Sequence, residues 1–131
     1  MSEERKKLGE AELEIMQVLW QAGEALTAPR VLEALPNRNW AMGTLITVLQ
    51  RLTHKGFLAC EKRPRSSIYV PLISEEAYLA EEGKSFLERL YGNSFRSMVA
   101  SFYGGKVIGE SDIAELQSYL STLQKGDVND A

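Results

Sequence analysis

Residues 40–56 read WAMGTLITVLQRLTHKG, and this stretch predicts a helix with two unlike faces. The apolar face repeats at i, i+4 and i+7 and consists of Leu45, Leu49 and Leu52. The polar face repeats at i, i+3 and i+7 and consists of Thr44, Thr47 and Arg51. The apolar face should pack on a core. The polar face carries short hydroxyls and an arginine instead of the usual solvated mixture of Glu and Lys, which suggests that it contacts something other than water.

A hairpin with a basic tip is expected directly after this helix. Gly56 should end the helix, with Lys55 in the last turn, where a cation suits the helix dipole. Short strands are predicted over residues 57–61 and 68–72, joined by residues 62–67. This order is typical of a winged helix-turn-helix, in which the helix enters the major groove of DNA and the hairpin reaches the backbone.

Two shorter helices should precede the recognition helix. The first is predicted over residues 8–21 and is broken by Gly23. The second should be capped by Thr27 and end before Pro36. Residues 36–39 form the expected turn, and Asn39 is predicted to cap the recognition helix.

Three amphipathic helices are expected after Ser74: residues 74–91, residues 94–103 and a last helix capped by Ser111. About 55 residues make a poor core alone, so a second copy of the chain should cover their apolar faces. Packing of these helices on the winged helix of the same chain is the alternative. The predicted homodimer contacts are Leu79, Phe86, Leu87, Leu90, Phe95, Met98, Val99, Phe102, Ile113, Leu116, Leu120 and Leu123.

The predicted architecture is therefore mainly α with a small β wing. Residues 1–73 form a winged helix-turn-helix domain that binds DNA, and residues 74–131 form a three-helix dimerisation domain. The net charge of −3 argues against a nucleic-acid partner only until its distribution is considered. Residues 36–71 hold six basic residues and one acidic residue, so the positive charge gathers on the predicted reading head.

Composition excludes several other classes of protein. No apolar run is long enough to cross a membrane and the charged start lacks a signal-peptide core, so we expect a cytoplasmic protein with no membrane insertion. One cysteine and one histidine leave too few ligands for a metal site, and Cys60 is expected to be a small core residue. Motifs for a cofactor or for catalysis are absent from the sequence, so we expect no enzyme.

Three segments resemble the penicillinase repressor family of the BlaI and MecI type. Residues 44–52 followed by Lys55-Gly56 resemble its recognition helix, residues 8–20 its first helix and residues 86–92 its dimerisation segment. The resemblance extends from Leu8 to Leu123. It implies a repressor that binds a palindromic double-stranded DNA operator with TACA/TGTA-like half-sites, in a system of antibiotic resistance.

Recognition-helix and wing residues should make the DNA contacts, with phosphate contacts from the wing. The predicted DNA-binding residues are Asn39, Met42, Gly43, Thr44, Ile46, Thr47, Arg51, Lys62, Arg63, Arg65 and Ser66. Gly43 and Ile46 depart from the larger polar or basic residues that the family often carries. Ile46 offers only an apolar contact and Gly43 only backbone, so the operator sequence can differ from that of the family.

The resemblance also implies a route of release. In relatives that respond to β-lactams, a membrane-bound sensor protease triggers cleavage between Asn and Phe in the dimerisation region, and Ser101-Phe102 occupies the matching place here. Copper sensing is disfavoured because the tail lacks the cysteines of the copper-responsive members. A winged helix used for protein contact, without sequence-specific DNA binding, is the alternative function.

Overall fold

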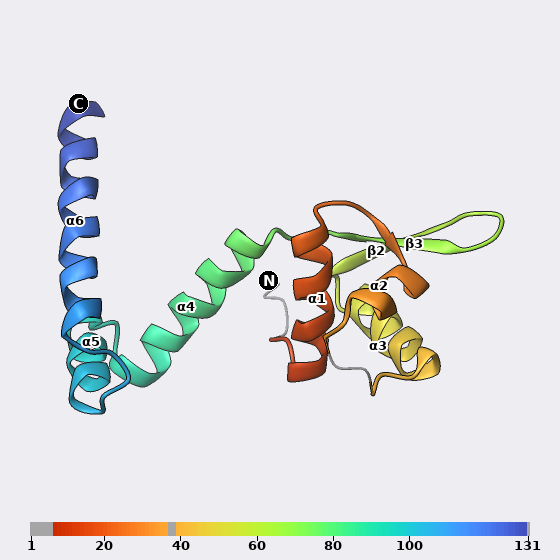
Figure 1. Cartoon of the computed structure of the whole chain (residues 1–131), viewed down its shortest axis with the longest axis horizontal. Coiled ribbons are helices and arrows are strands. Elements are labelled where there is room, and N and C mark those ends of the chain that lie inside the picture. The colour runs from red at the N-terminus through yellow and green to blue at the C-terminus, as the bar shows by residue number, and fades with distance from the viewer. Residues whose placement is uncertain (1–6, 37–38, 131) are drawn as a thin grey trace. The chain divides into compact units, whose positions relative to one another are not determined.

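The computed structural model describes residues 7–36 and 39–130 (Figure 1). Six helices and three short strands follow one another in these residues. They are α1 (Glu10–Ala22), β1 (Leu26–Thr27), α2 (Ala28–Ala34), α3 (Met42–His54), β2 (Leu58–Lys62), β3 (Ser67–Pro71), α4 (Glu75–Tyr91), α5 (Phe95–Gly104) and α6 (Glu110–Asp130). Helices α1 to α3 with the β2–β3 hairpin make a winged helix-turn-helix, as predicted. Among the described residues, no helix combines the length and the apolar character needed to span a bilayer.

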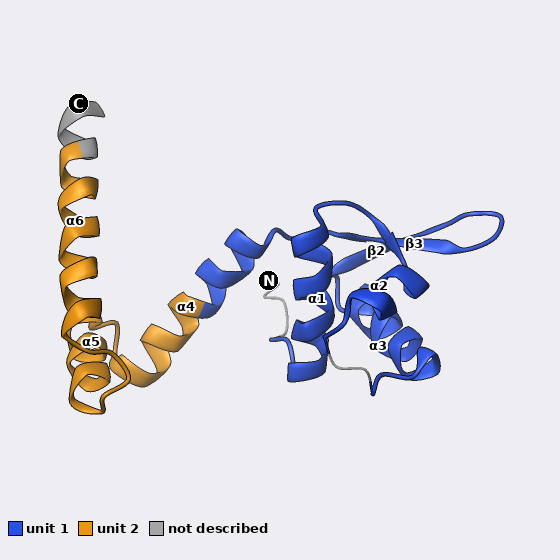
Figure 2. Cartoon of the chain, viewed as in Figure 1, with its two compact units in different colours: residues 1–82 blue, residues 83–131 orange. Residues whose placement is uncertain are grey.

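The chain forms two compact units, residues 1–82 and residues 83–131 (Figure 2). Helix α4 begins in unit 1 and ends in unit 2. We predicted the boundary between residues 73 and 74, but the first two turns of α4 belong to the winged helix. The reason is Tyr78, which is buried and whose ring lies 5.7 Å from that of Trp20 and 5.9 Å from that of Phe57.

The core of unit 1 collects the apolar faces of its helices. Leu45, Leu49 and Leu52 of α3 are buried, as predicted, and Val48 between them is buried too. They pack in one cluster with apolar residues of α1, of α2 and of the sheet. Burying one face of α3 leaves the opposite face at the surface.

Several helix ends follow the predicted capping. Gly23 ends α1 in the left-handed conformation with φ of 69°, and Gly56 follows α3 with φ of 89°. Thr27 caps α2, because its hydroxyl accepts a hydrogen bond from the Arg30 amide at 3.4 Å.

The start of α3 differs from the prediction. Its N-cap residue is Ala41, which offers no side-chain cap, so the prediction that Asn39 caps this helix is wrong. Residues 37 and 38 of the predicted turn lie outside the described residues. Trp40 anchors the chain just before the helix: it is partly buried against the core, and its Nε1 donates a hydrogen bond to Glu14 Oε1 at 3.0 Å.

The strands form one antiparallel sheet in the order β1-β3-β2. The hairpin was predicted to within one residue, whereas the two-residue β1 was not expected, because so short a strand has no periodicity of its own. Cys60 lies opposite Tyr69 and packs, partly buried, against the core. The hairpin tip is closed by a hydrogen bond of 2.8 Å from the Arg63 amide to the Ser66 carbonyl, and it extends beyond the helices of unit 1 (Figure 1).

Unit 2 consists of the end of α4 with α5 and α6. Ser94 caps α5 by accepting a hydrogen bond from the Ser97 amide at 3.1 Å. Helix α6 begins at Glu110, so the prediction that Ser111 caps it is wrong. The Asp112 carboxylate instead accepts a hydrogen bond from the Gly109 amide at 2.8 Å.

Candidate nucleic-acid interface

The exposed face of α3 presents the predicted polar residues to solvent. Thr44, Thr47 and Arg51 are all exposed, while the leucines on the opposite side are buried. The Thr47 hydroxyl donates a hydrogen bond to the Gly43 carbonyl at 3.1 Å, so an outside donor can still use its oxygen as an acceptor. This face therefore offers short hydroxyls near the helix start and a guanidinium near its end.

The other predicted base-contact residues on α3 divide into two kinds. Gly43 is exposed, and a side chain there would meet no atom within 4 Å beyond its own helix, so packing does not require glycine. Met42 and Ile46 are partly buried and pack against the core. These two residues have a packing role, and only part of each side chain remains for a contact with a base or sugar.

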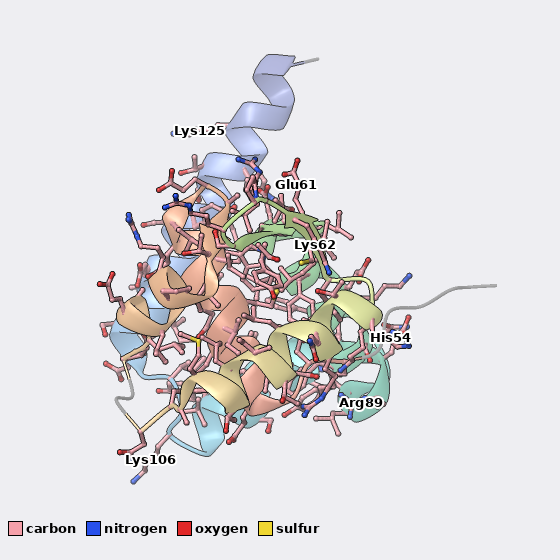
Figure 3. All side chains as sticks on the ribbon, turned by 90° about the vertical axis from the view of Figure 1, so that its right-hand side faces the viewer. His54, Glu61, Lys62, Arg89, Lys106 and Lys125 are labelled. Carbon is pink, nitrogen blue, oxygen red and sulfur yellow. The ribbon has the colours of Figure 1, made fainter. Side chains whose placement is uncertain are left out.

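The wing supplies the remaining cations. Lys62, Arg63 and Arg65 are exposed, and so is the neutral Ser66 beside them. Arg63 lies 3.4 Å from Glu61 between Nη2 and Oε1, and both side chains are more than half exposed. Figure 3 shows Glu61 and Lys62 on the hairpin. A pair this exposed is worth little, so Glu61 does not prevent Arg63 from binding phosphate.

A buried carboxylate, which the sequence analysis missed, supports the end of the recognition helix. Glu12 of α1 has a side chain only 5% exposed, and its Oε1 accepts a hydrogen bond from Lys55 Nζ at 2.7 Å. Its Oε2 lies 3.6 Å from Arg51 Nη1. Lys55 Nζ also donates to the Lys7 carbonyl at 3.2 Å. Glu12 therefore ties α1 to two cations at the end of α3.

The environment of Glu12 favours its charged form. Burial by itself raises the pKa of a carboxyl group. Hydrogen bonds from Lys55 and from the Gly9 amide at 2.8 Å, together with the charges of Lys55 and Arg51, outweigh burial and lower the pKa of Glu12. The spacing of Gly9 and Glu12 could have indicated a helix start. It carried no signal for Lys55, which lies 43 residues further along the chain.

The predicted dimer contacts leave apolar surface uncovered. Leu79, Leu90, Phe95, Leu120 and Leu123 are 58%, 57%, 49%, 43% and 45% exposed. The other seven predicted contacts are partly buried; they are Phe86, Leu87, Met98, Val99, Phe102, Ile113 and Leu116. Within unit 2, α5 and α6 line an apolar groove of about 560 Å³. Its apolar walls are Phe95, Val99, Ala100, Tyr103, Ile113 and Leu116.

The predicted cleavage position lies inside α5. Ser101 is exposed and its hydroxyl oxygen accepts a hydrogen bond of 3.2 Å from Tyr91. Phe102 is partly buried, with its ring 6.3 Å from that of Tyr91 and edge-on to it. The peptide bond between them is helical, and its downstream residue packs inside unit 2.

The family profile and two named relatives point to one family. The sequence profile described as penicillinase repressor matches residues 8–122. A penicillinase repressor of Bacillus licheniformis is 33% identical over 114 residues, which cover 87% of this chain and 89% of that protein. The methicillin resistance regulatory protein MecI of Mammaliicoccus sciuri is 26% identical over 121 residues, covering 92% of this chain and 98% of that protein.

Several solved structures are also similar to parts of this chain. The solution structure of the DNA-binding domain of the repressor BlaI is 32% identical, with a TM-score of 0.49, and the match covers 56% of this chain and 90% of that one. The family profile spans most of the chain, and the relative from Bacillus licheniformis is matched over nearly its whole length. This chain therefore belongs to the penicillinase repressor family.

Proposed function

We propose that this protein is a transcriptional repressor that binds a palindromic DNA operator as a homodimer. The observation that carries the proposal is the surface of unit 1, where the exposed polar face of α3 and the cationic wing occur together. Family membership supports it, because one relative is named a penicillinase repressor and another a methicillin resistance regulatory protein.

Affinity and specificity would come from different parts of this surface. Lys62, Arg63 and Arg65 neutralise phosphates and supply affinity that depends on salt but carries little sequence information. Thr44 and Thr47 contact base edges or thymine methyl groups from the first turns of α3. Arg51, held on one side by Glu12 and half exposed on the other, binds a phosphate beside the helix.

Dimerisation would place two winged-helix domains on one operator. The support is the exposed apolar side chains of α4 to α6, since five of the predicted dimer contacts are at least 43% exposed in the single chain. A patch of this kind generally marks an interaction site. Linking two half-site contacts through a dimer raises affinity by about 10²–10⁴ without any new contact to DNA.

The proposal extends to release of the repressor from DNA by proteolysis. The peptide bond that would be cleaved is Ser101–Phe102, and a membrane-bound sensor protease would trigger the cleavage. Because this bond is helical and Phe102 is partly buried, α5 must open locally before a protease can bind it. Loss of an intact α5 would remove one wall of the apolar groove and with it the dimer contact.

A salt titration of DNA binding tests the proposal. The ligands are a duplex with two inverted TACA/TGTA half-sites, a scrambled duplex of equal length, and a duplex selected by this protein from a random pool. The variant replaces Lys62, Arg63 and Arg65 with Ala. The matched control replaces three exposed cations of unit 2 with Ala, and Figure 3 labels them: Arg89, Lys106 and Lys125.

We expect tighter binding to a palindrome than to the scrambled duplex, with a steep loss of affinity as salt rises. The wing variant should flatten the salt dependence by about three units, one for each phosphate contact, and the control should not. Absence of binding to all three duplexes at low salt would refute the proposal and favour a winged helix used for protein contact.

A further inference from the structure

The first turn of α4, residues 75–78, which we call its root, is held to the winged helix by the buried side chain of Tyr78. Tyr78 is 6% exposed, although it lies in the first turns of a helix whose neighbouring residues are mostly exposed. Its hydroxyl oxygen accepts a hydrogen bond of 3.3 Å from the Leu8 amide, 70 residues away in the chain. Its ring packs on Trp20 of α1 and edge-on to Phe57.

These contacts connect α4 to the recognition helix by a short path. Phe57 lies three residues after the end of α3, and its amide donates a hydrogen bond of 3.0 Å to the Leu52 carbonyl in α3. The Phe57 carbonyl in turn accepts a hydrogen bond of 2.8 Å from the Leu72 amide. The end of the recognition helix thus contacts the root of α4 through two aromatic rings.

A second contact holds the backbone just before α4. Trp20 Nε1 donates a hydrogen bond of 2.9 Å to the carbonyl of Ile73, which is itself buried. The backbone is therefore held at residue 73 and the helix at residue 78. One of these contacts lies just before α4 and the other in its first turn, and both lie within unit 1.

We infer that Tyr78 is a positioning residue that fixes the winged helix to α4 and so sets the half-site spacing that the dimer accepts. The inference rests on the proposed function, since it concerns a dimer bound to a palindrome. Helix α4 carries the chain from the reading head to unit 2. If the root is rigid, the distance between the two α3 helices follows from how the dimer forms. If the root is loose, each winged helix can reach its half-site independently of the other.

Spacing is a sensitive readout because DNA is helical. Adding two base pairs between half-sites moves one by about 7 Å along the axis and turns it by about 70°. A rigid dimer then loses much of its gain of about 10²–10⁴ from bivalent binding. A dimer with loose heads keeps most of that gain at the wrong spacing.

The experiment measures the affinity of the full-length protein for a series of palindromes whose half-sites are moved apart or together by up to three base pairs, and for a duplex with a single half-site. The variants are Tyr78→Ala and Trp20→Phe. Trp20→Phe keeps an aromatic ring and removes the hydrogen bond to Ile73. The control is Glu76→Ala, an exposed position in the first turn of α4. Circular dichroism and thermal unfolding establish that each variant is folded.

We expect the wild type and the control to lose at least tenfold in affinity at the wrong spacing. Tyr78→Ala should reduce this loss to less than about threefold, with unchanged affinity for the single half-site, and Trp20→Phe should shift it in the same direction. If Tyr78→Ala fails to fold, Trp20→Phe decides the question.

Two results would overturn the inference while leaving the repressor function intact. One is a spacing profile in the folded variants that matches that of the wild type. The other is an equal loss of affinity for the single half-site, which would mean that Tyr78 supports the reading surface itself. Failure of the wild type to bind any of these duplexes would instead count against the proposed function.

Discussion

Replacing Glu12 with Gln should destabilise unit 1 at neutral pH, although this side chain lies in no predicted site. The substitution keeps the size of the side chain and an oxygen that can accept from the Gly9 amide, but it removes the charge that faces Lys55 and Arg51. Glu12 is 5% exposed, Lys55 is 18% exposed and Arg51 is 53% exposed in the side chain. The loss therefore comes mainly from the short contact with Lys55.

The size of the effect follows from these exposures. A hydrogen bond to a charged group contributes about 1.5–3 kcal/mol, and the half-exposed Arg51 adds little because water screens its charge. We expect a loss of about 2 kcal/mol in the free energy of unfolding, or roughly 1 M in the urea midpoint. Glu10→Gln is the matched control, because Glu10 is an exposed acid in the same first turn. It should cost less than about 0.5 kcal/mol.

The effect should also depend on pH in a defined direction. The pKa of Glu12 is lower in the folded protein than its ordinary value of 4.5, so its charged form stabilises the fold. This stabilisation is complete above pH 4.5 and is lost as the pH falls through the lowered pKa. Urea unfolding at a series of pH values should show the difference between wild type and Glu12→Gln shrinking over that range. Equal stabilities of Glu12→Gln and Glu10→Gln at pH 7 would refute this reasoning.

Three further outcomes are expected. Arg65→Ala should lower the salt slope of operator binding by about one unit in a fluorescence titration, and an unchanged slope would remove this residue from the phosphate contacts. Gly83→Ala should raise the free energy of unfolding by about 0.5–1 kcal/mol, because Gly83 lies exposed inside α4 with open space for a methyl group; thermal unfolding checks this, and a lower stability would contradict it. Leu116→Ala should weaken the proposed dimer by at least about tenfold in sedimentation equilibrium, since it removes apolar volume from the groove between α5 and α6, and an unchanged dimer would exclude this groove from the interface.

Local patterns were sufficient for most of the elements. The period of the leucines in α3 predicted its buried face, and Gly23 and Gly56 marked helix ends because both need positive φ. Local patterns failed at Asn39 and Ser111. Both are favourable capping residues, but the helices begin three residues after the first and one residue before the second. Capping preference indicates that a helix starts nearby, while the packing of neighbouring residues such as Trp40 decides the residue at which it starts.

The sequence by itself determined the order of the elements, the polar face of α3, the cationic wing and the apolar faces of α4 to α6, because each is a pattern within a few turns of one segment. Only the tertiary structure decided what those segments meet. The contacts of Glu12 with Lys55, of Trp20 with Ile73 and of Tyr78 with Leu8 join residues 43, 53 and 70 positions apart. Periodicity reports which side of a helix is apolar, but it carries no information about the partner that covers a given side chain. The support beneath the recognition helix and the division of α4 between the two units therefore came from packing alone.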